Sequence, residues 1–129
     1  MKKNQMLGLV YIFIFLLIIV GIVFFVRHKN SQPGPYDEFA QCLTDEEVTY
    51  YGAFWCPNCQ RQREMFKKSY KHIAYVECSN ANKSQNDLCE AAGIEAYPTW
   101  EFADGSRLEG VQSFEVLAEK TACVAPETN

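Results

Sequence analysis

Two cysteines near the middle of the chain have the residue type and spacing of a redox pair. Cys56 and Cys59 stand in the run Phe54-Trp55-Cys56-Pro57-Asn58-Cys59-Gln60, after an apolar stretch and before a segment with helical periodicity. This layout places Cys56 at the start of a helix and Cys59 one turn further along. A thiol at a helix N-terminus faces unpaired N–H groups and the positive end of the helix dipole, which favour the nucleophilic thiolate. The pattern therefore predicts thiol–disulfide exchange.

The two thiols are expected to have different roles. Cys56, at an exposed helix start, would attack and form a mixed disulfide with a client protein, and a more buried Cys59 would resolve it. Pro57 fits the first helical position, because no N–H is needed there and its φ is preset. Arg61 and the basic residues beyond it could add positive potential, or they could simply form a solvated helix face.

A Cys-x-x-Cys pair can also be half of a zinc site, which would need two further ligands. Cys78 and Cys89 could supply them, but these two are eleven positions apart, unlike a second Cys-x-x-Cys pair. Pro57 and the preceding Trp55 also suit a redox helix better. The sequence gives no indication of a metal, nucleotide or haem, so no cofactor is expected.

Short strands and helices must position this pair. Residues 48–54 are rich in β-branched and aromatic side chains, which predicts a buried strand. Residues 57–70 have the periodicity of a helix. We expect a short helix before them, over residues 36–43, and a second short strand after them, over residues 73–76.

The next helix is predicted from its capping residues. Ser84 would cap a helix that runs through residues 88–92, with Asp87 in the capping-box position. Gly93 would end that helix.

A hairpin and a last helix complete the predicted fold. Residues 98–102 and 107–110 alternate around Asp104-Gly105, which is a strong hairpin signal. Ser113 then caps a helix over residues 114–121. The expected order is α-β-α-β-α-β-β-α, an α/β fold.

An apolar run precedes these elements. The twenty residues 7–26 carry no charge, and about 20 apolar residues span a bilayer as a helix. A cleaved signal peptide is the alternative, but it has a shorter apolar region and a small-x-small cleavage site. Here Arg27-His28-Lys29-Asn30 follows instead. We predict a transmembrane anchor over residues 1–29, a linker over 30–35 and a folded body over 36–129.

Charge and cysteine content limit the function and location. The net charge of the 129 residues is −4, and all 16 acidic residues lie from Asp37 onward, so a nucleic-acid partner is not expected. Basic residues flank both ends of the apolar run, so they do not orient it. Six cysteines in so short a chain indicate an oxidising compartment. We therefore expect a single-pass protein of the cytoplasmic membrane with its body outside the cytoplasm, in a periplasm, a lumen or the cell exterior.

Four cysteines remain besides Cys56 and Cys59, and they allow three pairings. We favour Cys78–Cys89, which would close a loop from a strand end to the next helix. Cys42–Cys123 would then tie the first helix of the body to the last. Both are expected to be structural disulfides. The alternative is a redox relay through Cys78 and Cys89.

In combination these motifs resemble thioredoxin. The resemblance is carried by Trp55-Cys56-x-x-Cys59 after a strand, by Tyr97-Pro98-Thr99, and by the final hairpin and helix. The body is more closely similar to the thioredoxin-like domain that accompanies vitamin K epoxide reductase homologues, over residues 51–59, 75–78 and 97–102. This implies a thioredoxin-like fold. The first strand of thioredoxin is missing here, so a small four-stranded mixed sheet is expected.

The resemblance also implies a function and partners. Such a domain passes disulfides between client proteins and a quinone-linked membrane enzyme, which would here be a separate chain because only one span is predicted. We therefore expect a membrane-anchored thiol–disulfide oxidoreductase active in oxidative folding. One alternative is a reductase of the same fold, for example in cytochrome maturation. Another is a tethered binding module without turnover.

The resemblance assigns roles to residues around the cysteines. It implies that Pro98 is cis and that the main chain of Tyr97 pairs with an extended client segment. From the sequence alone, Pro98 could also be a proline at a strand entry. Trp55 and Tyr97 would line an apolar groove, and with Pro57 and Pro98 they form the expected substrate-binding residues.

One residue of the thioredoxin pattern is missing. Thioredoxins carry a buried aspartate before the motif that accepts a proton from the resolving cysteine, and Tyr50 stands at that position here. Glu77 is a candidate substitute, or else a surface residue of its strand. The missing carboxylate, together with the expected structural disulfides, favours the oxidative direction.

Overall fold

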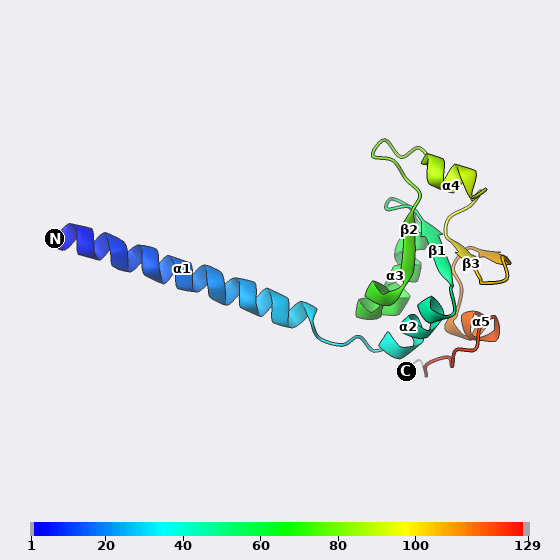
Figure 1. Ribbon diagram of the computed structural model, residues 1–129, viewed down its shortest axis with the longest axis horizontal. Coiled ribbons are helices and arrows are strands. Elements are labelled where there is room, and N and C mark those ends of the chain that lie inside the picture. The colour runs from blue at the N-terminus through cyan, green and yellow to red at the C-terminus, as the bar shows by residue number, and fades with distance from the viewer. Residues whose placement is uncertain (1, 128–129) are drawn as a thin grey trace. The chain divides into compact units, whose positions relative to one another are not determined.

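The computed structural model describes residues 2–127, apart from the side chains of Lys3, Asn4 and Asn30. Met1 of the predicted anchor and residues 128–129 of the predicted body therefore lie outside the described residues. The chain divides into two compact units, Met1–Gln32 and Pro33–Asn129. Figure 1 shows the helices and strands of both units.

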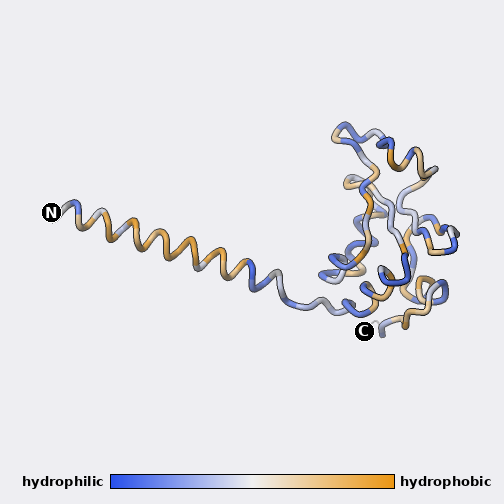
Figure 2. Tube along the Cα trace, in the orientation of Figure 1, coloured by the Kyte–Doolittle hydropathy of each residue, from blue (hydrophilic) through white to orange (hydrophobic). Residues whose placement is uncertain are grey.

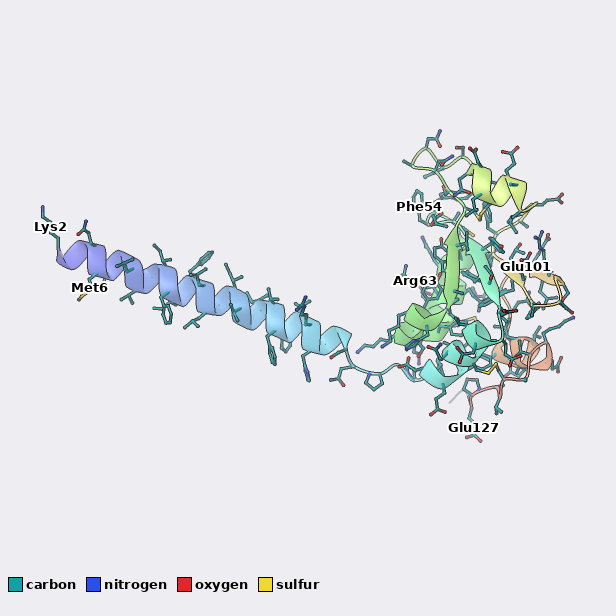
Figure 3. All side chains as sticks on the ribbon, in the orientation of Figure 1. Lys2, Met6, Phe54, Arg63, Glu101 and Glu127 are labelled. Atoms are coloured by element: carbon teal, nitrogen blue, oxygen red, sulfur yellow. A yellow bond between two sulfur atoms is a disulfide. The ribbon has the colours of Figure 1, made fainter. Side chains whose placement is uncertain are left out.

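The first unit is one long helix, α1 (Lys3–Asn30). Its segment Gln5–Lys29 is long and apolar enough to cross a membrane. Hydrophobic residues dominate this segment (Figure 2), and their side chains project on more than one side of the helix (Figure 3). Arg27, His28 and Lys29 occupy the last turn, where positive charge complements the helix dipole.

A mixed sheet of four strands lies at the centre of the second unit. The order is β2 (Ala74–Glu77), β1 (Thr49–Gly52), β3 (Thr99–Glu101) and β4 (Arg107–Glu109). β1 is parallel to β2 and antiparallel to β3, and β3 is antiparallel to β4. This sheet confirms the predicted number of strands and their mixed directions.

Helices flank the sheet (Figure 1). They are α2 (Asp37–Asp45), α3 (Pro57–Phe66), the 3-10 helix η1 (Lys67–His72), α4 (Asp87–Ala91) and α5 (Phe114–Glu119). Apart from η1, the order in this unit is the predicted α-β-α-β-α-β-β-α. The α/β architecture is thus that of a small thioredoxin-like fold.

The predicted helix over residues 57–70 is interrupted. α3 ends at Phe66, and the Lys67 backbone adopts a φ of 52° before η1 begins a tighter turn. Ser69 of η1 is buried, and its hydroxyl accepts a hydrogen bond from the Tyr36 N–H at 2.8 Å. This contact reaches across the fold, so helical periodicity alone could not reveal it.

The predicted cap of the fourth helix is wrong. Asn86, not Ser84, caps α4, because its side chain accepts a hydrogen bond from the Cys89 N–H at 3.0 Å. Ser84 instead donates to Asn82 within the preceding turn, at 2.7 Å. Asp87 is then the first residue of the helix rather than the capping-box residue. Gly93, with a φ of 66°, follows the helix as predicted.

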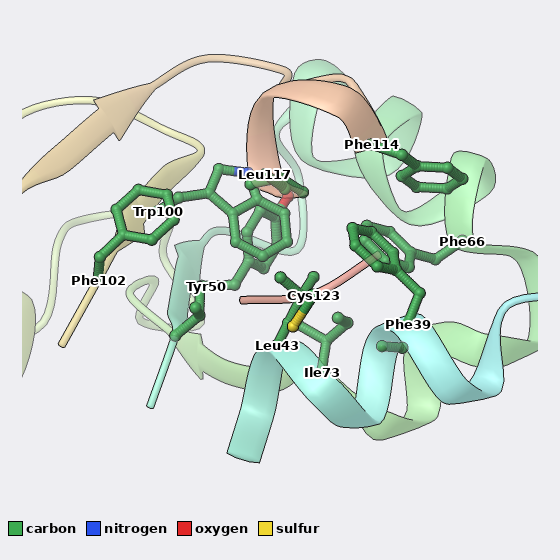
Figure 4. Close-up of a cluster of buried hydrophobic side chains, with 12 residues drawn as sticks. Phe39, Leu43, Tyr50, Phe66, Ile73, Trp100, Phe102, Phe114, Leu117 and Cys123 are labelled. Atoms are coloured by element: carbon green, nitrogen blue, oxygen red, sulfur yellow. The ribbon is translucent and has the colours of Figure 1, made fainter. Parts of the chain in front are cut away.

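Aromatic side chains of the sheet and of the helices around it form the main core (Figure 4). The Tyr50 ring of β1 lies 4.4 Å from Trp100 of β3, and Phe66 at the end of α3 lies 4.8 Å from Phe114 of α5. Cys123 is part of this core and bonds to Cys42 of α2. Because Phe66 is fully buried, the core fixes α3 and with it the position of the Cys56–Cys59 segment.

Candidate active site

Cys56 is the residue that opens α3. It is the N-cap, with extended backbone angles, and Pro57 follows at the start of the helix. The N–H of Cys59 points back and donates to Cys56 Sγ at 3.3 Å. The sulfur therefore receives a hydrogen bond from a helix N-terminus, the arrangement that stabilises a thiolate.

The two sulfurs differ less in exposure than the sequence led us to expect. Cys56 is 5% exposed and Cys59 is 6% exposed, so the expectation of an exposed Cys56 and a more buried Cys59 is wrong. The side chain of Tyr97 packs against the small cluster of Ala53, Cys56 and Cys59, and the Tyr97 carbonyl oxygen lies 3.6 Å from Cys56 Sγ. Tyr97 lies in a loop far along the chain, so the local sequence around Cys56 could not predict that this residue buries it.

Only Cys56 and Cys59 are free among the cysteines, all six of which the structure describes. The other four form the disulfides Cys42–Cys123 and Cys78–Cys89, with Cα–Cα distances of 5.8 and 5.4 Å. Cys78 and Cys89 are each 0% exposed. These two sulfurs are fully covered, whereas Cys56 keeps some exposure, which argues against a relay through them. Sulfurs bonded to each other are also not available as zinc-binding thiolates.

The loop that contains Tyr97 and Pro98 lies beside Cys56. The bond between these two residues is cis. Pro98 is fully buried, and its carbonyl accepts a hydrogen bond from the Gly110 N–H at 2.8 Å. Among residues 2–127, no hydrogen-bond partner is found for the Tyr97 N–H. The main chain of Tyr97 therefore has a donor to offer next to the reactive sulfur.

Two aromatic rings form an apolar surface next to the cysteines. The Trp55 and Tyr97 rings meet edge to face, with their centroids 6.2 Å apart. Trp55 is 37% exposed, and its indole N–H is held by the Ser79 hydroxyl at 2.8 Å. Pro57, the first residue of α3, is also exposed. Of the predicted substrate-binding residues, Trp55, Pro57 and Tyr97 thus lie next to Cys56, and Pro98 is buried.

Tyr50 fills the position where a carboxylate was expected from the thioredoxin resemblance. Its ring is fully buried, and its hydroxyl donates to the Cys59 carbonyl oxygen at 3.4 Å. Burial strongly raises the pKa of Tyr50, so the hydroxyl stays protonated. Burial likewise raises the pKa of the Cys59 thiol, to about 12, while the Tyr50 hydroxyl acts in the opposite direction.

Close packing around Cys59 depends on a glycine. A Cβ atom at Gly52 would lie 3.1 Å from Cys59 Sγ and 3.1 Å from Cε2 of Tyr75. Both atoms therefore abut the bare backbone of β1. A side chain at this position would have to displace the sulfur or the ring.

Glu77 is more than a surface residue of its strand. Its carboxylate accepts hydrogen bonds from the N–H groups of Phe54 and Ser79, at 3.3 and 2.8 Å, and from the Tyr75 hydroxyl. Sequence reasoning missed Tyr75 as a neighbour of Cys59. The period-2 pattern of a strand places Tyr75 and Glu77 on one face, and this signal could have linked them.

No protein-family model matches the chain. The chain is similar to a thiol-disulfide oxidoreductase. This relative is thiol-disulfide oxidoreductase LTO1 of Arabidopsis thaliana, which is 34% identical over 116 residues. The match covers 85% of this chain and 31% of the relative, so the chain spans about a third of the length of the relative that it matches.

Proposed function

We propose that this chain is a membrane-anchored thiol–disulfide oxidoreductase that exchanges disulfides with extracytoplasmic client proteins through Cys56 and Cys59. The observation that carries this proposal is the free cysteine pair at the start of α3, where the Cys59 N–H donates to Cys56 Sγ at 3.3 Å. The similarity to LTO1, named as a thiol-disulfide oxidoreductase, supports it.

The exchange would proceed through a mixed disulfide. A client thiolate attacks Sγ of Cys56 in the oxidised protein, the Cys56–Cys59 bond breaks, and Cys59 leaves as a thiolate that takes up a proton. A second client thiolate then attacks the client sulfur, forms the client disulfide and expels the Cys56 thiolate. The α3 N-terminus stabilises that leaving thiolate, which favours the donation of disulfides over their reduction.

The client would bind as an extended segment beside Cys56. The unpartnered N–H and the carbonyl of Tyr97 suit main-chain pairing with such a segment. The Trp55 and Tyr97 rings offer apolar contact, and the exposed Pro57 borders the same surface, while Pro98, joined to Tyr97 by the cis bond, is buried. These contacts depend little on the amino-acid sequence of the client, as a protein with many clients requires.

The reduced protein must be reoxidised after each exchange. We assign this step to a separate quinone-linked membrane enzyme of the vitamin K epoxide reductase type. Helix α1, which is long and apolar enough to cross a membrane, would hold both proteins in one bilayer. The body would face the oxidising side, where the two disulfides persist.

A refolding assay tests the proposed function. Oxidised protein is mixed with a reduced, unfolded model client, and disulfide formation in the client is followed by mass. We expect the wild type to donate one disulfide per chain and C56S to donate none. In a companion reaction with an oxidised client, the Cys56 thiolate of reduced C59S should attack the client disulfide and accumulate as a mixed disulfide. Equal activity of C56S and the wild type would indicate a binding module, and preferential reduction of a client disulfide would indicate a reductase.

A further inference from the structure

A pocket opens beside Cys59, on the side of the sulfur that faces β2. Its volume is about 270 Å³. Besides Cys59, its lining includes Arg63 of α3, Tyr70 of η1, and Tyr75 and Glu77 of β2. Glu77 carries the one carboxylate among the residues that line the pocket.

We propose that Glu77 accepts the proton of Cys59, and returns it, through water held in this pocket. This inference rests on the proposed function, since only a cysteine that exchanges disulfides must change its protonation. The pocket has ample volume for water, and the Glu77, Tyr75 and Arg63 side chains give that water polar partners.

The Glu77 carboxylate and Cys59 Sγ both border this pocket. Cys59 Sγ and the Tyr75 ring abut the same point on the Gly52 backbone, each 3.1 Å from the Cβ position there. The Tyr75 hydroxyl, at the far end of that ring, donates to Glu77. The N–H groups of Phe54 and Ser79 hold the other carboxylate oxygen. Glu77 is therefore fixed at the pocket wall instead of extending into solvent.

Cys59 needs such a partner because its surroundings disfavour the thiolate. The sulfur is 6% exposed, and burial raises the pKa of the thiol. When the Cys59 sulfur attacks Sγ of Cys56 in a mixed disulfide, the client leaves as a thiolate and the Cys59 proton passes by way of water to the Glu77 carboxylate. In the reverse direction the protonated Glu77 returns that proton to the departing Cys59 thiolate.

The other titratable groups near Cys59 cannot take this role. Burial raises the pKa of the Tyr50, Tyr70 and Tyr75 hydroxyls, so each of them stays protonated. Arg63 is a cation with no site to accept a proton, and Cys56 is itself bonded to the client at this step. A carboxylate is the remaining group that can exchange a proton near neutral pH.

The resolving step can be measured in the full chain in detergent. Reduced protein is mixed with one equivalent of 5,5′-dithiobis(2-nitrobenzoate). Attack by Cys56 releases one thionitrobenzoate, and the intramolecular attack by Cys59 releases a second in a phase independent of protein concentration. The rate of this second phase is recorded between pH 5 and pH 9 for the wild type, for E77Q and for E77D.

We expect E77Q to slow the second phase about 100-fold at pH 7, the lower end of the effect of a positioned acid or base. The deficit should shrink as the pH rises, because hydroxide replaces the carboxylate, and E77D should recover part of the rate. The matched control is E64Q, which removes a carboxylate from the exposed surface of α3 and should leave the rate unchanged.

Equal second-phase rates for E77Q and the wild type across this pH range would overturn the assignment of Glu77 while leaving the proposed function intact. A deficit in E77Q that stays constant with pH would also overturn it, because a merely structural role predicts that result. If the wild type shows no second phase at all, the proposed function fails and the role of Glu77 fails with it.

Discussion

Cys59 lies in an aromatic environment that is unusual for a group that must ionise. The Tyr50 ring lies 6.0 Å from Tyr70 and 5.8 Å from Tyr75, centroid to centroid, and Cys59 shares a wall of its pocket with the latter two. In place of the carboxylate that the resemblance implies, Tyr50 offers a neutral hydroxyl. Such a donor can stabilise a thiolate, but it cannot remove the proton, so the two tasks are divided between different residues.

The buried Cys59 thiol should titrate well above an ordinary cysteine. Its pKa is raised to about 12, mainly by burial, so the thiolate fraction rises tenfold per pH unit through the neutral range. In C56S, alkylation of Cys59 by iodoacetamide should therefore keep accelerating up to pH 10, as measured by mass spectrometry. A rate that levels off near pH 9.0, the ordinary thiol pKa, would contradict this picture.

The raised pKa of Cys59 also makes the stability of the folded, reduced protein depend on pH. The folded reduced protein holds the Cys59 proton more tightly than the unfolded chain does. The stabilisation is therefore present below the ordinary thiol pKa of 9.0 and is lost as the pH rises from there towards about 12. The oxidised protein, which has no thiol at this position, lacks this dependence.

Among the elements, α3 shows best what local sequence can and cannot predict. Its start was predictable, because the N-cap residue Cys56 and the N-terminal residue Pro57 are adjacent in the sequence. Its end at Phe66 was not, because Lys67 takes a φ of 52° in a turn fixed by contacts of η1 with the start of the body. The cap of α4 was missed for a local reason, because the Ser84 hydroxyl donates to Asn82 within the preceding turn.

The pocket beside Cys59 could not be predicted from local patterns either. It requires β1 and β2 to pair in parallel, with Gly52 opposite Glu77. Each strand was expected, and so was the order of the strands and α-helices in the sheet-containing unit. Register, however, is a long-range property, and it alone brings Tyr75 and Glu77 to the side of the sulfur.

The two disulfides should contribute unequally to stability. Cys42–Cys123 joins residues 81 apart and Cys78–Cys89 joins residues 11 apart. In the chain-entropy model the longer loop contributes about 4.5 kcal/mol and the shorter about 3 kcal/mol. Urea unfolding of the pairwise Cys→Ala variants should show the larger loss for C42A/C123A. A larger loss for C78A/C89A would show that packing around the disulfide, rather than loop length, decides its contribution.

At the scale of the whole molecule, the apolar helix and the folded unit are separable. All members of the main core lie between Phe39 and Cys123, within the unit Pro33–Asn129. A chain of residues 33–129 should therefore fold and remain soluble, whereas the full chain should stay in the membrane fraction after alkaline carbonate extraction. Release of the full chain by carbonate would contradict a membrane anchor.

The side of the membrane on which the body lies can be tested in cells that produce the full chain. A thiol reagent that does not cross membranes should modify reduced Cys56 in intact cells if the body faces outward. The C56S variant controls for reaction elsewhere. Modification only after permeabilisation would place the body in the cytoplasm and remove the basis for an extracytoplasmic client.

The reduction potential of the Cys56–Cys59 pair tests the central claim most directly. The chain is equilibrated with glutathione redox buffers, and mass spectrometry follows this pair while checking that the other two disulfides stay intact. A donor of disulfides predicts a potential between about −120 and −200 mV, in the range of known oxidants and isomerases. A potential of about −270 mV or lower, the value of thioredoxin, would contradict that claim and indicate a reductase.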